Sequence, residues 1–554
     1  MMHNNKGKKI LQEYYYKGEK MPNYLLQISA KKVQNFIFQS TKFKHILGAN
    51  AVVGSLFSDE FTKLKKKISA GPSIPWQSIE PNIERKYDLP WENFSDGIIA
   101  CSGGHFEALF NDKEHLEHFC KEAAKKARDC APGLMLDFFM YHINLEDSFD
   151  PSVKHYYRHK HSLIEELHHI LNSSTIDNPF MQLSIDGEDP IPSLKDKSNN
   201  NEISYTQSIL ELSCEKIKNG TSNDYLTQWV KDLESEIQYE SCDDIEELYK
   251  LSDTSKSNQV CMIKLDGNAT GNLFRNKQLD IGEKKLSNSN ALYEMEYFWY
   301  QNRESIRKRM SNAIQSAILD LQSKYRESKF IQKIKLPLIV FMMGGDDILL
   351  LCIPEFAYPF IKYFFAAEEG ITFSAGMLFY KHNYPILHAH NITETLLSSA
   401  KIKARENAEL ASSIDWHLLF STKPESIETI RQQDYYISYP NDNKFTFEVL
   451  SQKPYRIKEA LAIFENAERI VENFSKTGES EKTGRNKYKL IRSSIYKGHS
   501  HLEHLIKALN LKDEKWIKYD LINKNGNEIY STQMLDIIEL IDLFPELGNK
   551  GEQK

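Results

Sequence analysis

The residues with the clearest chemical potential are two adjacent carboxylates at the tip of a predicted hairpin. The motif Gly-Gly-Asp-Asp at positions 344–347 lies between two apolar runs, residues 336–343 and 348–353. Short apolar runs on either side of a glycine turn predict two buried strands. Neighbouring carboxylates repel each other unless a cation compensates them, and oxygen ligands suit Mg²⁺, with Mn²⁺ as the alternative ion. An ordinary solvated hairpin turn is the other interpretation of this motif alone.

A second predicted strand that ends in an aspartate lies upstream. The apolar run 260–265 is followed by Asp266 and by a glycine-containing turn that leads into a predicted helix, whose first amides would suit a phosphate. If the two strands are sheet neighbours, Asp266 meets Asp346 and Asp347 at one edge. Three carboxylates then hold one or two Mg²⁺ ions, the arrangement used for attack of a ribose hydroxyl on an α-phosphate. These three aspartates are the predicted catalytic and metal-binding residues.

This order of elements resembles the palm domain of the CRISPR-associated polymerases, the large subunits of type III CRISPR effector complexes. That family is related more distantly to GGDEF-type nucleotide cyclases. The resemblance continues in residues 371–379, which are similar to the next palm strand, and in residues 396–401, which are similar to the family's Leu-Leu-x-x-Ala-Lys helix. The family's lysine faces the nucleotide triphosphate, so the resemblance implies this role for Lys401. Asn268 stands where many relatives carry a further acid, so the metal site would rest on three aspartates.

The nucleotide is expected to contact the two glycine turns, the strand after the hairpin and the following helix. The Ser374 hydroxyl and Gly376 are predicted to leave space for a base or ribose against the backbone. The predicted nucleotide-binding residues are Gly267, Asn268, Gly271, Gly344, Gly345, Ser374, Gly376 and Lys401.

The N-terminal region carries a second likeness to the same family. Residues 28–38 resemble the opening of the family's first palm, and residues 96–110 repeat the strand–Gly-Gly–strand pattern. In this copy His105 and Phe106 stand where the hairpin has Asp346 and Asp347. Glu107 does not replace the pair, because side chains alternate between the two faces of a strand. The chain therefore reads as an internal duplication with one active palm and one degenerate palm.

The predicted fold class is α+β, with two ferredoxin-like, nucleotide cyclase-like palm domains, a helical linker and a helical C-terminal domain. We expect a flexible tail over 1–22, the first palm over 23–150, a mostly helical region over 151–255, the second palm over 256–447 and the helical domain over 448–554. Only 22 residues precede the first palm, and no Cys-x-x-Cys pair is present. The HD nuclease and zinc ribbon of many family members are therefore expected to be missing, as in a compact or stand-alone member.

Composition narrows the class of protein. A length of 554 residues predicts about three to four domains. The net charge of −7 gives no overall nucleic-acid footprint, so an RNA surface would have to be a local patch. No apolar run approaches the ~18 residues of a membrane span. Seven scattered cysteines indicate reduced thiols. The reduced thiols and the lack of a long apolar run together predict a cytoplasmic protein without a membrane partner.

Two further features favour structural over functional interpretations. The basic run over 485–492 is expected to be a solvated helix face rather than an RNA or triphosphate contact. Two histidine-rich groups have helical spacing that zinc could use, but a polar helix surface is the preferred interpretation. The groups are His161, Glu165, His168 and His169, and His499, His501, Glu503 and His504.

The resemblance implies a nucleotidyltransferase that converts ATP into 3′–5′-linked, often cyclic, oligoadenylates in type III CRISPR or related antiviral signalling. Its implied partners are guide RNA, target RNA and other type III subunits. A catalytically silent scaffold subunit and a cyclase that uses another nucleoside triphosphate are the alternatives. A scaffold has no reason to keep three repelling carboxylates, which favours the enzyme. Base preference, product linkage, ring size, activation by target RNA and oligomeric state stay open at this stage.

Overall fold

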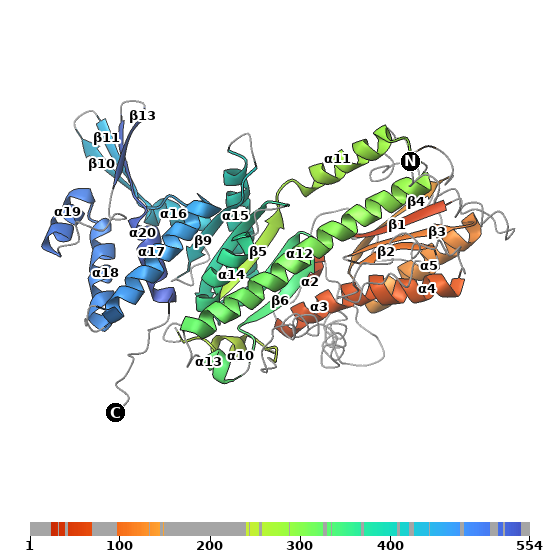
Figure 1. Ribbon diagram of the computed structural model, residues 1–554, viewed down its shortest axis with the longest axis horizontal. Helices are drawn as coiled ribbons and strands as arrows, with labels where there is room; N and C mark the ends of the chain where they lie inside the picture. The colour runs from red at the N-terminus through yellow and green to blue at the C-terminus, as the bar shows by residue number, and fades with distance from the viewer. Residues whose placement is uncertain are drawn as a thin grey trace, which may run out of the picture. The chain divides into compact units, whose positions relative to one another are not determined.

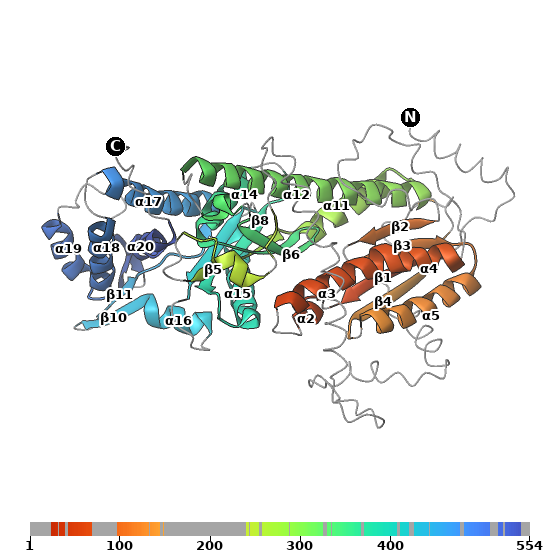
Figure 2. The same ribbon diagram turned by 90° about the horizontal axis from the view of Figure 1, so that it is seen from below.

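Figure 1 and Figure 2 show the computed structural model of the chain. The structure describes residues 24–31, 33–38, 43–68, 97–102, 104–131, 133–143, 148, 240–242, 244–253, 258–286, 288–324, 329–333, 335–366, 370–406, 410–419, 426–441, 444–476, 481–509, 519–524 and 527–544. The predicted tail, most of the predicted region 151–255 and the histidine group at 161–169 lie outside these described residues. In the described part of the chain, no helix has the length and apolar character needed to cross a membrane.

The contacts divide the chain into two compact units. The N-terminal unit holds residues 1–222 and 269–305, and the second unit holds residues 223–268 and 306–554. This differs from the predicted boundaries, which assign residues 269–305 to the second palm. Helix α12 (Asn288–Lys324) crosses the division, and its first part packs within the N-terminal unit.

The N-terminal unit is built on a four-stranded antiparallel sheet in the order β2-β3-β1-β4. Its strands are β1 (Tyr24–Lys31), β2 (Ile98–Ser102), β3 (His105–Phe110) and β4 (Met135–His142). Its helices are α2 (Val33–Ile37), α3 (Phe43–Ser55), the π-helical turn η1 (Leu56–Glu60), α4 (Phe61–Ile68), α5 (Lys113–Cys130) and α11 (Thr270–Glu283), with the first part of α12.

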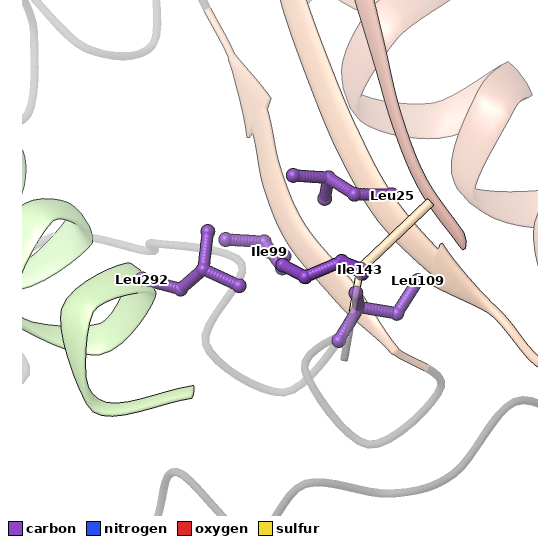
Figure 3. Packing of buried hydrophobic residues seen from close by; sticks show 5 residues of the cluster. All are labelled: Leu25, Ile99, Leu109, Ile143 and Leu292. Atoms are coloured by element: carbon purple, nitrogen blue, oxygen red, sulfur yellow. The ribbon is translucent and has the colours of Figure 1, made fainter. Parts of the chain in front are cut away.

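Both faces of this sheet are covered. On one face, the Phe106 ring stacks on Phe119 of α5 at 5.4 Å and meets Phe61 of α4 edge-on at 5.7 Å. On the other face, an apolar cluster joins the sheet to α12, as Figure 3 shows. Its members are Leu25, Ile99, Leu109, Ile143 and Leu292. Burial of apolar surface by this cluster explains why residues 269–305 group with the N-terminal unit.

The second unit is built on a six-stranded sheet in the order β12-β9-β8-β5-β7-β6. Its strands are β5 (Gln259–Gly267), β6 (Leu338–Gly344), β7 (Asp347–Cys352), β8 (Phe373–Lys381), β9 (Ser413–Leu418) and β12 (Tyr455–Arg456). Helices α10 (Ile245–Tyr249), α13 (Lys329–Gln332), α14 (Pro354–Ala366) and α15 (Ile386–Ala404) belong to the same unit. The predicted hairpin of two apolar strands at the Gly-Gly-Asp-Asp motif is confirmed as β6 and β7.

The strand order of the first sheet recurs in the second. The order β6-β7-β5-β8 repeats β2-β3-β1-β4, and all pairs are antiparallel. Helix α5 connects β3 to β4 in the first sheet, and α14 connects β7 to β8 in the second. The two sheets therefore share one strand order, while the duplication of a palm domain stays a prediction. The alignment of the two hairpins differs by one residue from the prediction, because Ser102 pairs with His105 whereas Gly344 pairs with Asp347.

His105 thus takes the place of Asp347, and Phe106 lies on the face that α4 and α5 cover. The partner of His105 on β1 is Ser29, whose Oγ lies 3.0 Å from His105 Nδ1. At the position where the second sheet has facing carboxylates, the first sheet therefore has the neutral pair of Ser29 and His105 on its two central strands.

A third sheet follows, in the order β10-β11-β14-β13. Its strands are β10 (Tyr436–Asn441), β11 (Lys444–Val449), β13 (Asp520–Lys524) and β14 (Asn527–Ser531). Helices α16 (Ile427–Asp434), α17 (Ile457–Lys476), α18 (Glu481–Ile495), α19 (His499–Ala508) and α20 (Met534–Leu540) and the 3₁₀ turn η6 (Ile541–Leu543) accompany it.

The prediction of a helical C-terminal domain therefore holds for α17 to α20 but misses the strands. Strand β11 crosses the predicted boundary at 447/448, and β13 and β14 lie within the supposed helical domain. These strands are only five or six residues long and rich in polar residues, so they produce no long apolar run. Helical periodicity, which is strong in α17, dominates the pattern around them.

Helix α15 approaches strand β8 closely at Gly376. A Cβ at this position would lie 2.5 Å from the Thr393 carbonyl oxygen and 2.6 Å from the Leu397 nitrogen, both in the backbone of α15. The predicted space for a base or ribose at Gly376 is thus occupied by the helix, which corrects that expectation. The role of Gly376 is to let α15 pack directly on the sheet.

Gly376→Ala should lower the free energy of unfolding by about 1–3 kcal/mol or more, because backbone atoms cannot move aside as a flexible side chain would. Gly54→Ala is the matched control: Gly54 is an exposed residue of α3 with nothing within 4 Å of the added Cβ. That control should raise stability by roughly 0.5–1 kcal/mol, the helix preference of alanine over glycine. Urea unfolding followed by circular dichroism measures both changes. Equal stability of Gly376→Ala and the wild type would contradict the close packing.

Candidate functional site

The aspartates from the two turns meet at one edge of the second sheet, as predicted. Strands β5 and β7 are antiparallel neighbours, and Leu265 pairs with Ile348 at the end of their ladder. The next residues along are Asp266 and Asp347, which therefore lie opposite each other on the same face. Their side chains are 26% and 29% exposed, so a ligand from solvent can reach both carboxylates.

Asp346 lies with Gly345 in the turn between β6 and β7. Gly345 has a φ of +69°, a conformation that favours glycine. A Cβ added at Gly344 or Gly345 would meet nothing within 4 Å, so the backbone of this turn is open to an incoming group. The open space around these two residues therefore agrees with the prediction that a ligand can approach the glycine turn.

Two lysines contact the facing carboxylates. Lys401 Nζ, on α15, lies 2.8 Å from Asp266 Oδ1, and Lys264 Nζ, on β5, lies 3.5 Å from Asp347 Oδ1. The expectation that these acids repel each other without a metal is therefore wrong for Asp266 and Asp347. Each already has a cation of the chain beside it.

The metal site expected at the three aspartates is not assembled in this structure. Among the described residues, no group of three histidine, cysteine, aspartate or glutamate side chains has a geometry that could hold a metal ion. The donor set nevertheless fits Mg²⁺ in kind, since it consists of carboxylate oxygens at one sheet edge. In this structure the Lys401 ammonium supplies the positive charge next to Asp266.

Asn268 and Ser374 form a buried hydrogen-bonded anchor rather than an exposed binding surface. Ser374 Oγ donates to Asn268 Oδ1 at 2.7 Å, and the Asn268 backbone N–H donates to the Thr372 carbonyl at 2.7 Å. The Asn268 amide Nδ2 lies 3.3 Å from Thr372 Oγ1 and 3.4 Å from the Ala411 carbonyl oxygen. A carboxylate could not donate these bonds, which explains an asparagine where an acid was the alternative.

The anchor extends from Ser374 to α15. Ser374 is fully buried, and its Oγ lies 3.2 Å from Ser413 Oγ, which donates to the Ala400 carbonyl at 2.6 Å. The predicted nucleotide contact of the Ser374 hydroxyl is therefore replaced by a positioning role. These bonds fix the end of β5, and with it Asp266, against β8, β9 and α15.

The two glycines of the first turn, Gly267 and Gly271, belong to different compact units. Gly267 is the last residue of β5 and is buried. Gly271 lies in the first turn of α11, which begins after Ala269 in a left-handed conformation with φ of 55°. The predicted strand–turn–helix order is confirmed, and nucleotide binding by either glycine stays a prediction.

Three further residues belong to the site and were missed by sequence reasoning. Lys264 is 1% exposed and contacts Glu394 Oε1 as well as Asp347. His390 Nε2 lies 3.3 Å from the same Glu394 oxygen. His390, Glu394 and Lys401 recur at helical spacing along one stripe of α15. The available signals were a lysine inside an otherwise apolar strand and this spacing.

Burial holds His390 in its neutral form. It lowers the pKa of the imidazole to about 4; the neighbouring Glu394 carboxylate opposes this shift and the Lys264 ammonium adds to it. At neutral pH the charged groups around Lys264 are therefore the two carboxylates of Asp347 and Glu394.

Of the remaining candidate residues, Arg485 and His499 have structural partners, whereas His501, Glu503 and His504 are exposed, as expected for a polar helix surface. Arg485 donates to the carbonyl oxygens of Ile541 at 2.8 Å and Phe544 at 3.0 Å, so its predicted position on a solvated face is wrong. Lys489 of the same basic run is exposed, in agreement with the prediction. His499 Nδ1 lies 2.9 Å from the buried Glu448 carboxylate, and its ring stacks on Tyr530 at 4.2 Å. These contacts tie α18 and α19 to their neighbours.

No family model matches the sequence, and no curated protein matches it. Solved structures do match, and they are of proteins from type III CRISPR complexes. The protein in them is Csm1. The Csm1–Csm4 subcomplex of the type III-A CRISPR-Csm interference complex is 13% identical, with a TM-score of 0.47 over 94% of this chain and 70% of that chain.

Two further matches are similar in extent. A Csm1–Csm4 cassette in complex with AMPPNP is 13% identical, with a TM-score of 0.48 over 95% of this chain and 70% of that chain. Csm1 in T. onnurineus is 11% identical, with a TM-score of 0.44 over the same shares of the two chains.

His390→Gln should flatten the loss of stability in acid. Because the folded pKa of about 4 lies below the usual 6.5, the unfolded chain binds the proton more readily between these values. The free energy of unfolding therefore falls as pH is lowered through this window, and glutamine removes that contribution. Urea titrations at several pH values measure the slope. His388→Gln, an exposed histidine of the same helix, should keep the wild-type slope. An unchanged slope in His390→Gln would contradict the buried neutral imidazole.

Proposed function

We propose that this protein is a metal-dependent nucleotidyltransferase that forms 3′–5′ phosphodiester bonds between ATP-derived nucleotides. The observation that carries the proposal is the placement of Asp266 and Asp347 side by side at one sheet edge, next to an open glycine turn and within reach of Lys401. Paired carboxylates beside exposed backbone suit a magnesium–triphosphate complex.

Each residue then has a defined task. Asp266, Asp346 and Asp347 would hold Mg²⁺, which when bound neutralises charge that develops on the attacked phosphate. The turn at Gly344 and Gly345 lets phosphate oxygens approach the backbone. Lys401 would leave Asp266 as the metal binds there, and its ammonium would then compensate the β- and γ-phosphates. The Asn268–Ser374 anchor keeps Asp266 in register throughout.

The two similar sheets would be two palm domains, of which only the second is active. In the first, Ser29 and His105 occupy the positions of the facing carboxylates and supply no charged oxygen ligand. That half would serve binding. The products would be oligoadenylates, in linear or cyclic form, within type III CRISPR or related antiviral signalling. Guide RNA, target RNA and other type III subunits would be its partners.

The Csm1–Csm4 structures that match this chain include complexes with ATP and with cA4. Those ligands are properties of the matched proteins, which are 11% and 12% identical to this chain. For this chain, support for nucleotide chemistry comes from its own carboxylates, glycine turn and lysine.

A catalytically silent scaffold is the second candidate function, and one observation favours it. Lys401 and Lys264 compensate Asp266 and Asp347 without any metal, so the acids would be tolerated in a protein that binds no cation. A cyclase that uses another nucleoside triphosphate is the narrower alternative. The deciding experiment incubates the purified chain with each labelled nucleoside triphosphate and Mg²⁺ or Mn²⁺, with product analysis by mass spectrometry.

ATP-dependent formation of oligoadenylates would support the enzyme. Products from a different triphosphate would move the substrate assignment to that nucleotide. Absence of product together with absence of Mn²⁺ binding by the wild type would leave the scaffold as the better description.

Asp346→Asn with Asp347→Asn should reduce product formation by at least about a hundredfold, because neutral amides cannot hold the divalent ion that stabilises the transition state. Far-UV circular dichroism should be unchanged, since both side chains keep their size. Asp434→Asn, an exposed aspartate at the end of α16, is the control and should retain full activity. Wild-type turnover in the double variant would refute the assignment of these acids.

Lys401→Ala should weaken ATP binding by about 1–3 kcal/mol, the range for a lost charge-assisted contact. Mn²⁺ binding should persist or strengthen, since Asp266 loses a competing ammonium. Lys401→Arg should recover only part of the ATP affinity, because the planar guanidinium does not reproduce the ammonium position.

Lys403→Ala is the matched control for Lys401→Ala. Lys403 lies on the same helix and pairs with the exposed Glu406 at 2.8 Å. Isothermal calorimetry with a non-hydrolysable ATP analogue measures all three variants. If Lys401→Ala binds the analogue as tightly as Lys403→Ala, Lys401 does not contact the nucleotide.

A further inference from the structure

A lysine ammonium is buried next to the proposed metal site. The Lys264 side chain is 2% exposed, and its Nζ lies between two carboxylates from different elements. One is Asp347 at the start of β7, with Oδ1 at 3.5 Å, and the other is Glu394 on α15, in closer contact. A buried ammonium is tolerated only where carboxylates compensate it, so both acids matter to this position.

The two carboxylates differ in what else they can do. Asp347 is a proposed metal ligand at the sheet edge, whereas Glu394 is held on α15 between Lys264 and the neutral His390. If Lys264 depended on Asp347 alone, a divalent ion on Asp347 would face an uncompensated positive charge a few ångströms away. Such like-charge repulsion is strong where little water screens it.

From this arrangement we propose that Glu394 is a positioning residue that holds the Lys264 ammonium and thereby leaves Asp347 available for the divalent cation. The inference rests on the proposed function, since it concerns the metal of that site. Glu394 acts through Lys264 and does not itself bind the ion. The carboxylate of Glu394 thus sets the affinity of the site for metal without being a ligand.

The proposal is distinguished from direct ligation by a pair of variants. Glu394→Gln keeps the size of the side chain but removes its charge, so Lys264 turns to Asp347 and opposes the ion. A second change, Lys264→Met, removes the opposing charge with an unbranched side chain of similar length. If Glu394 acts through Lys264, the double variant regains metal affinity. If Glu394 were itself a ligand, the double variant would stay weak.

The experiment titrates Mn²⁺ alone into the full chain without nucleotide and follows free Mn²⁺ by electron paramagnetic resonance. Glu394→Gln should raise the dissociation constant on the order of tenfold. Lys264→Met with Glu394→Gln should return it to within about threefold of the wild type or below, because neither charge remains. Circular dichroism and urea unfolding confirm that each variant is folded.

Glu406→Gln is the matched control, because it removes one carboxylate just beyond α15 that is about half exposed and pairs with Lys403. It should leave the Mn²⁺ constant unchanged. Wild-type affinity in Glu394→Gln, or a double variant no tighter than Glu394→Gln, would overturn this inference while leaving the aspartate site standing. Failure of the wild type to bind Mn²⁺ would overturn the metal site and this inference together.

Discussion

The close contact between α15 and β8 at Gly376 is the constraint on which the site depends. Because no side chain separates the helix from the sheet, the stripe of α15 that carries His390, Glu394 and Lys401 lies against the edge where β5 and β7 end. The hydrogen bond from Ser413 to the Ala400 carbonyl fixes the helix along its axis. Together these contacts determine which charged groups of the helix meet which aspartates of the strands.

Much of this arrangement could be predicted from the sequence. Short apolar runs and a glycine turn identify β5, β6 and β7, and strand-end aspartates identify the edge at which they meet. The recurrence of the strand–glycine–strand pattern predicts the repeated sheet order. These predictions succeed because hydrophobic periodicity and turn residues are local signals, and buried strands of adequate length express them clearly.

The rest of the arrangement depends on strand register and on the pairing of side chains. Both are set by residues that lie far apart in the sequence. The one-residue shift that aligns His105 with Asp347 is set by which residues close each hairpin. Likewise, Ser374 and Asn268 look like exposed polar candidates in the sequence, but they are buried and hydrogen-bonded to each other, to Ser413 and to Thr372. The role of Lys264 emerges only when β5, β7 and α15 are brought together. The short polar strands β13 and β14 lack a periodic signal altogether.

The ion pair between Lys401 and Asp266 has a consequence for ion selectivity. A site that already contains an ammonium gives a monovalent ion no electrostatic advantage, because one unit charge would replace another at similar distance. In the proposed site, a divalent ion would bring a second unit of charge and would also engage Asp347, so it alone would gain from the replacement. If the proposed metal site forms, potassium and sodium would therefore be rejected by their valence before ionic radius or coordination geometry comes into play.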